Sequence, residues 1–118
     1  MEYTREFLID LNVIQNLKEL GGDDGGDFFK EIITLFSDQY PQLLQNINTF
    51  ARNKDFDNLS KSAHALKGAC LNIGAKELSE ICKKIEINSK THIYDEIDEL
   101  LSKIDTVHQL TMNEINLL

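Results

Sequence analysis

The chain has 118 residues, and its 20 acidic and 12 basic side chains give a formal net charge of −8. This length predicts one domain over residues 1–118, and a hydrophobic fraction of 42% excludes a disordered chain. No apolar run approaches the ~20 residues of a membrane span, and the acidity disfavours nucleic-acid binding. The first ten residues lack the order of a signal peptide, and the two cysteines form no CxxC motif. Together these features predict a cytoplasmic protein.

Apolar side chains recur at steps of three and four residues along several segments, which is the pattern of amphipathic helices. Pro41 falls inside the second segment and predicts a kink there, and Gly74 ends the third. Short connections make sequential helices antiparallel. The prediction is an all-α fold, an antiparallel up-down four-helix bundle with a short additional N-terminal helix. The segments are 11–20, 29–50, 59–73, 78–85 and 93–111, with further apolar residues to Leu118.

The third predicted helix carries side chains that face away from its apolar stripe. On a wheel of ~100° per residue, His64, Lys67, Gly68 and Leu71 form an outer patch at i, i+3, i+4 and i+7. Glycine inside a helix costs ~1 kcal/mol relative to alanine, so the empty space beside the imidazole needs a reason. A neutral imidazole is a nucleophile, and Lys67 would stabilise an anionic group on the ring. The patch suits a histidine that accepts a phosphoryl group, and a solvated histidine beside a solvated lysine is the alternative.

The stretch 64–75, His-Ala-Leu-Lys-Gly-Ala-Cys-Leu-Asn-Ile-Gly-Ala, resembles the signature of histidine-containing phosphotransfer (HPt) domains. That signature is His-x-Leu-Lys-Gly followed by a small-residue turn into the next helix. The resemblance extends over residues 11–48, 59–63 and 75–82, whereas the last predicted helix matches only in pattern. It implies that His64 accepts a phosphoryl group from a receiver-domain aspartate or a kinase and passes it to another receiver. It also implies that Lys67 steadies the phosphoryl oxygens and that Gly68 makes room for the partner.

The resemblance also sets the expected surroundings of this site. The partners would be response-regulator receiver domains or a hybrid sensor histidine kinase, with no nucleic acid and no membrane involved. No cofactor of the protein's own is implied, because Mg²⁺ would belong to the receiver's site. The protein is expected to act in a two-component phosphorelay. Nothing in the sequence requires an oligomer, so a monomer is expected.

Glu86 is a further candidate, because the turn near Gly74 brings residues 84–86 level with His64 in an antiparallel hairpin. HPt domains often carry Gln or Glu there, bonded to the second imidazole nitrogen. Glu86 is therefore expected to accept from Nδ1–H and to leave Nε2 free to attack. A glutamate on a solvated helix face is the alternative.

Positive charge gathers on the same hairpin. Residues 59–90 hold six lysines and three glutamates, a net charge of +3, which leaves −11 for the rest of the chain. Such a face would steer the protein toward an acidic receiver pocket. The expected partner-binding residues are Lys61, Gly68, Leu71 and Lys84.

Other functions fit the sequence less well. No GxxxxGK[ST] motif is present, so neither autonomous kinase nor hydrolase activity is expected. Di-iron bundles use Glu-x-x-His pairs, and only Asp105-x-x-His108 comes near, so no metal site is predicted. His92, placed at the entry of the last helix, and His108 lack the companions of His64. The main alternative is a helical adaptor that docks receiver or kinase domains without being phosphorylated.

Overall fold

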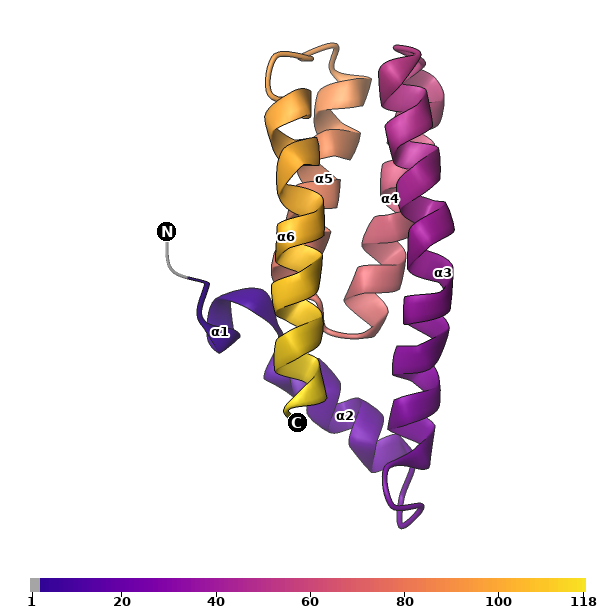
Figure 1. Cartoon of the computed structure of the whole chain (residues 1–118), viewed down its shortest axis with the longest axis vertical. Coiled ribbons are helices and arrows are strands. Elements are labelled where there is room, and N and C mark those ends of the chain that lie inside the picture. The colour runs from indigo at the N-terminus through magenta and orange to yellow at the C-terminus, as the bar shows by residue number, and fades with distance from the viewer. Residues whose placement is uncertain (1–2) are drawn as a thin grey trace.

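Four long helices run up and down beside one another, and two short helices precede them (Figure 1). The computed structural model describes residues 3–118, and it holds no strand in that range. The predicted all-α antiparallel bundle is confirmed. The helices are α1 (Arg5–Leu8), α2 (Leu11–Leu20), α3 (Asp27–Arg52), α4 (Phe56–Asn72), α5 (Lys76–Lys90) and α6 (Ile97–Asn116).

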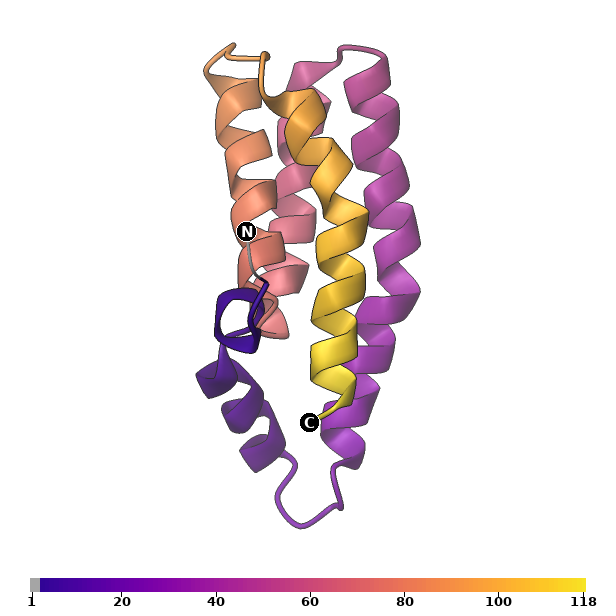
Figure 2. The ribbon, with the colours of Figure 1, turned by 60° about the vertical axis from the view of Figure 1, so that its left-hand side comes forward.

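The helices form because their apolar periods meet in one core. Helix α3 packs on α4, α4 on α5, and α5 on α6, while α2 lies obliquely across one end of the bundle (Figure 2). Helix α3 continues through Pro41 without ending there. No helix in residues 3–118 is both long and apolar enough to cross a membrane.

Most helix ends differ by a few residues from the predicted ones, and two differences, the presence of α1 and the start of α6, have a local cause. Helix α1 was not predicted, because four residues are too few to show a period; the Thr4 hydroxyl caps it by accepting from the Phe7 amide at 3.2 Å. Helix α6 begins at Ile97 and not at Ile93. His92 has a φ of 61°, so the chain turns away, and Tyr94 stacks on Phe56 with the ring centroids 3.7 Å apart. Ile93 and Tyr94 continue the apolar period of α6 toward the N-terminus although they are not helical, and the predicted start was therefore too early.

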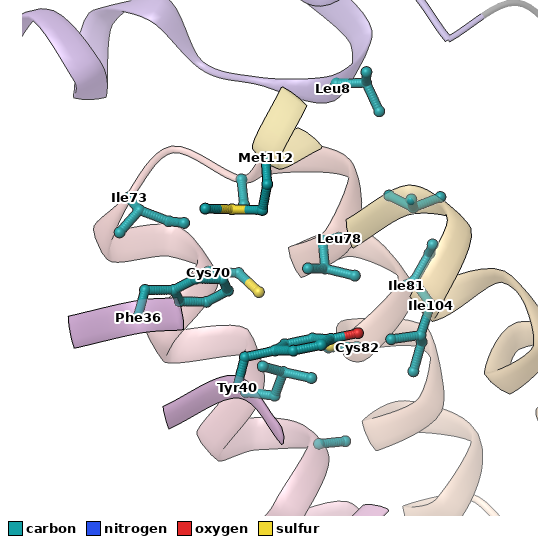
Figure 3. Close-up of a cluster of buried hydrophobic side chains, with 14 of the residues drawn as sticks. Leu8, Phe36, Tyr40, Cys70, Ile73, Leu78, Ile81, Cys82, Ile104 and Met112 are labelled. Carbon is teal, nitrogen blue, oxygen red and sulfur yellow. The ribbon is translucent and has the colours of Figure 1, made fainter. Parts of the chain in front are cut away.

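Both cysteines lie in the core as packing thiols (Figure 3). A side-chain hydrogen bond with Cys82, together with burial, raises the pKa of the Cys70 thiol far above its usual range. The Cys70 thiolate, which is the reactive form, is therefore disfavoured. The interpretation of Cys70 and Cys82 as buried structural residues is consistent with this environment.

The turn between α4 and α5 is tied to the start of α2. Gly74 has a φ of 74°, and its carbonyl accepts a hydrogen bond of 2.8 Å from the Asp10 amide. Asp10 in turn caps α2, since its carboxylate accepts from the amides of Asn12 and Val13. This junction places α2 beside the end of the hairpin that carries His64.

Candidate functional site

Helix α4 holds one face in the core and presents the other to solvent. Its N-terminus is capped by Asp55, whose carboxylate accepts from the Asn58 amide at 3.3 Å. Leu59, Ala63, Leu66 and Cys70 are all fully buried, which fixes the rotation of the helix. This rotation leaves Lys61, His64 and Ala65 exposed between the buried positions.

His64, Gly68 and Leu71 lie on that outward face, where the sequence placed them. The His64 side chain is 66% exposed, and Leu71 is 54% exposed. A Cβ built on Gly68 would meet no atom within 4 Å, apart from its own helix backbone and chain neighbours. The absence of a side chain at position 68 therefore keeps open space beside the imidazole.

Glu86 reaches the same place from α5. Its Oε2 lies 3.0 Å from His64 Nδ1, and its Oε1 accepts a hydrogen bond of 2.7 Å from Lys67 Nζ. The Glu86 side chain is only 8% exposed, so the alternative of a solvated glutamate does not hold. The antiparallel hairpin thus brings three predicted site residues together.

The charge state of Glu86 decides the tautomer of His64. Burial by itself would raise the pKa of Glu86, but hydrogen bonds from Lys67, Lys90 and His64 outweigh it and lower the pKa to about 2. An ionised carboxylate can only accept, so the proton of a neutral imidazole sits on Nδ1. Nε2 then carries the lone pair, and no hydrogen bond engages it within residues 3–118.

Sequence reasoning missed one member of this cluster. Lys90 Nζ donates to Glu86 Oε2 at 3.1 Å, from one turn further along α5. The signal was available, because Glu86 and Lys90 are an i, i+4 pair on a helix. Lys61 and Lys84 are exposed and make no ion pair within the part of the chain that the structure describes.

The other two histidines lie in different surroundings. His92 sits in the α5–α6 turn, contrary to the predicted helix entry, and its Nδ1 lies 2.6 Å from the Tyr94 hydroxyl. His108 is half-buried in α6 and stacks on Tyr40 with the ring centroids 3.6 Å apart. Burial lowers the pKa of His108, partly opposed by Asp105.

Comparison with known protein families decides the assignment of this bundle. A family model described as "Hpt domain" matches residues 31–110, a range that includes His64, Lys67, Gly68 and Glu86. The chain belongs to the Hpt domain family.

Named relatives of this Hpt domain come from fungi and plants. It is 28% identical over 79 residues to the phosphorelay intermediate protein YPD1 of Candida albicans, covering 67% of this chain and 42% of the relative. It is 27% identical over 106 residues to histidine-containing phosphotransfer protein 2 of Arabidopsis thaliana, covering 87% and 67%. The chain thus spans less than half the length of the Candida relative.

Solved structures show the same fold. A histidine-containing phosphotransfer protein from Medicago truncatula superposes with a TM-score of 0.82 at 21% identity, covering 95% of this chain and 77% of the other. Histidine-containing phosphotransfer protein B from Pseudomonas aeruginosa superposes with a TM-score of 0.75 at 19% identity, covering 92% and 91%. The Hpt domain described here therefore has the bundle seen in plants and bacteria.

The hydrogen bonds that Glu86 accepts predict how the stability of this Hpt domain responds to acid. Because the folded-state pKa of Glu86 is about 2, below its unfolded value, its ionisation stabilises the fold above about pH 4.5. That stability is lost as pH falls toward 2. We expect Glu86→Gln to lower the free energy of unfolding by ~1–2 kcal/mol at pH 7, after discounting for the exposed Lys90 and His64. The difference from wild type should shrink between pH 4.5 and pH 2, as measured by urea unfolding.

Glu80→Gln is the matched control, because Glu80 is exposed on the same helix and makes no side-chain hydrogen bond within residues 3–118. It should change stability little at any pH. A Glu86→Gln deficit of constant size across this pH range would show that the ionised carboxylate does not stabilise the fold.

Proposed function

We propose that this protein is a histidine phosphotransfer protein of a two-component phosphorelay. It accepts a phosphoryl group on His64 from the aspartyl phosphate of a receiver domain, or from a kinase, and passes it to another receiver. One observation carries the proposal: the exposed imidazole of His64 is held through Nδ1 by the buried, ionised Glu86. The names of its relatives, phosphorelay intermediate and histidine-containing phosphotransfer protein, support it.

The chemistry follows from the tautomer. The Nε2 lone pair of His64 attacks the phosphorus of the aspartyl phosphate, an N–P bond forms, and the acyl P–O bond breaks. The receiver's aspartate leaves as a carboxylate, while Glu86 keeps the proton on Nδ1. Lys67 steadies the phosphoryl oxygens. Mg²⁺ would be held by the receiver's site, so the transfer would need no cofactor of this protein's own. No autonomous kinase or hydrolase activity is proposed, because the sequence has no GxxxxGK[ST] motif.

The surface around His64 suits a receiver domain. Gly68 leaves the approach open, Leu71 is exposed, and Lys61 and Lys84 are exposed on the hairpin. A shallow groove lies between α2, α3 and α4, and its lining residues in and after α4 are close to Leu71 in the sequence. Most of the lining is apolar: Leu17, Ile32, Leu35, Phe36, Ala69 and Ile73. We propose that receivers or a hybrid sensor kinase dock on this surface, and that nucleic acid and membrane do not. We also propose that the protein acts in the cytoplasm as a monomer of one domain.

Substitution of His64 tests the proposal. After incubation with a radiolabelled phosphorylated receiver, the wild type should carry phosphate that acid releases and base does not, as expected of an N–P bond. His64→Gln should lose this label altogether, because no other group replaces the nucleophile. His92→Gln should label as the wild type does.

Two results would refute the assignment. Equal labelling of the wild type and His64→Gln would place the phosphate elsewhere. Binding of several receivers without any labelling of the wild type would favour the helical adaptor.

A further inference from the structure

Lys67 is already bound to Glu86 in the unphosphorylated protein. Its Nζ donates to Glu86 Oε1 at 2.7 Å, and its side chain is only 22% exposed. Glu86 lies on the Nδ1 side of the imidazole, whereas phosphoryl oxygens bound at Nε2 would lie on the other side, so a Lys67 ammonium that turns toward them weakens its contact with Glu86. Breaking one partner of a buried ion pair is costly, because it leaves a buried charge uncompensated.

Lys90 supplies a second cation to the same carboxylate. Its Nζ donates to Glu86 Oε2 at 3.1 Å, and its side chain is 61% exposed. The charged groups of this cluster are Glu86, Lys67 and Lys90, next to the titratable His64. Helix α3, which packs on α4, carries no charged residue between Asp38 and Arg52. Glu86 therefore pairs with two lysines, so that it can lose its contact with Lys67 and still keep its contact with Lys90.

We propose that Lys90 is a positioning residue that keeps the negative charge of Glu86 paired while Lys67 changes partner from Glu86 to the phosphoryl group on His64. This inference rests on the proposed function of His64. With Lys90 in place, Glu86 stays ionised after Lys67 leaves, so it still accepts from Nδ1–H. The ring proton remains on Nδ1, and only the Nε2 lone pair enters the N–P bond.

The contacts indicate that Lys90 acts through Glu86 and not on the phosphoryl group. Lys90 binds Oε2, the oxygen that also contacts His64 Nδ1, whereas the phosphoryl group would sit on Nε2 across the ring. Lys67 binds the other oxygen, Oε1. The two lysines therefore bind different oxygens of Glu86, and a double-mutant cycle of Lys90 with Glu86 tests whether Lys90 acts through the carboxylate.

The cycle combines Lys90→Met with Glu86→Gln and uses phosphoramidate as a small phosphoryl donor. In this reaction the donor's P–N bond breaks, ammonia leaves, and the phosphorus binds Nε2 of His64. Lys90→Met should slow phosphorylation about three- to fivefold, the size expected for an exposed ion pair. In the Glu86→Gln background, Lys90→Met should have no further effect, because no carboxylate remains to be neutralised. Lys83→Met, an exposed lysine of α5 without an ion pair in residues 3–118, is the control.

Two results of the cycle would overturn the inference. An effect of Lys90→Met equal to that of Lys83→Met would show that Lys90 is only a solvated side chain. An equal slowing in both backgrounds would show that Lys90 acts on the phosphoryl group directly. Absence of phosphate on His64 in the wild type would instead refute the proposed function.

A second measurement needs no phosphorylation and mimics the departure of Lys67. In Lys67→Met, the ¹³C titration of the Glu86 carboxyl should keep its pKa below the ordinary ~4.3, and His64 should keep its Nδ1–H tautomer by ¹⁵N NMR. In the double variant with Lys90→Met, that pKa should rise to the ordinary value or above. Identical titrations of the single and double variants would overturn the role of Lys90.

Discussion

Replacing Gly68 by glutamine should slow phosphotransfer with a receiver by about 100-fold while leaving the fold intact. A Cβ at position 68 would meet no atom within 4 Å, so there is open space beside His64, and a receiver that docks as proposed would enter it. A longer side chain there fits the free protein and blocks the partner. Because glycine inside a helix is costly, the variant should gain ~0.5–1 kcal/mol of stability. Transfer rates and urea unfolding measure the two effects.

The small donor separates a steric effect from a chemical one. Gly68→Gln should still take phosphate from phosphoramidate at nearly the wild-type rate, because that donor needs little room. Thr106→Gln, at an exposed position of α6, which the proposed docking surface does not include, should leave receiver transfer unchanged. Wild-type transfer rates with a receiver in Gly68→Gln would remove the steric argument.

Replacing Gly74 by alanine should destabilise the protein by ~3 kcal/mol. Its φ of 74° is unfavourable for any residue with a Cβ, which costs ~1–2 kcal/mol. The added Cβ would also lie 2.9 Å from the Asp10 carbonyl and 3.3 Å from side-chain carbons of Val13 and Ile14. Backbone at that distance cannot yield without moving the start of α2 away from the hairpin. Urea unfolding monitored by circular dichroism measures the loss.

Gly22→Ala isolates the conformational part of this cost. Gly22 has a φ of 62°, but a Cβ there meets nothing within 4 Å. It should lose only ~1–2 kcal/mol. Equal losses in the two variants would show that the contact between Gly74 and α2 contributes nothing to stability.

Much of the fold could be predicted because its helices carry regular apolar periods. The stripe through Leu59, Leu66 and Cys70 fixed the rotation of α4, and the same stripe left His64 on the outside. Helix α1 could not be found this way, since it has no full period. The start of α6 was placed too early because Ile93 and Tyr94 continue the apolar pattern, and only the backbone turn at His92 separates them from the helix.

Three members of the site, His64, Lys67 and Glu86, could be predicted from the sequence, whereas their contacts and burial could not. Counting residues from the turn at Gly74 brought Glu86 level with His64, because a helical hairpin has a simple register. The sequence did not show that Glu86 is buried, or that Lys67 is bound to it at 2.7 Å in the unphosphorylated state. Burial depends on how α4 and α5 pack together, which spacing along one helix does not reveal. The second lysine, Lys90, could have been found from its i, i+4 spacing to Glu86 within α5.

In the proposed phosphotransfer, the phosphoryl group binds Nε2 of His64. Heteronuclear NMR of the ¹⁵N-histidine-labelled protein, phosphorylated by a receiver, tests it most directly. We predict a ³¹P–¹⁵N coupling to Nε2 of His64, with the proton retained on Nδ1 beside Glu86. Coupling to Nδ1, or to a nitrogen of His92 or His108, would contradict phosphotransfer to Nε2 of His64.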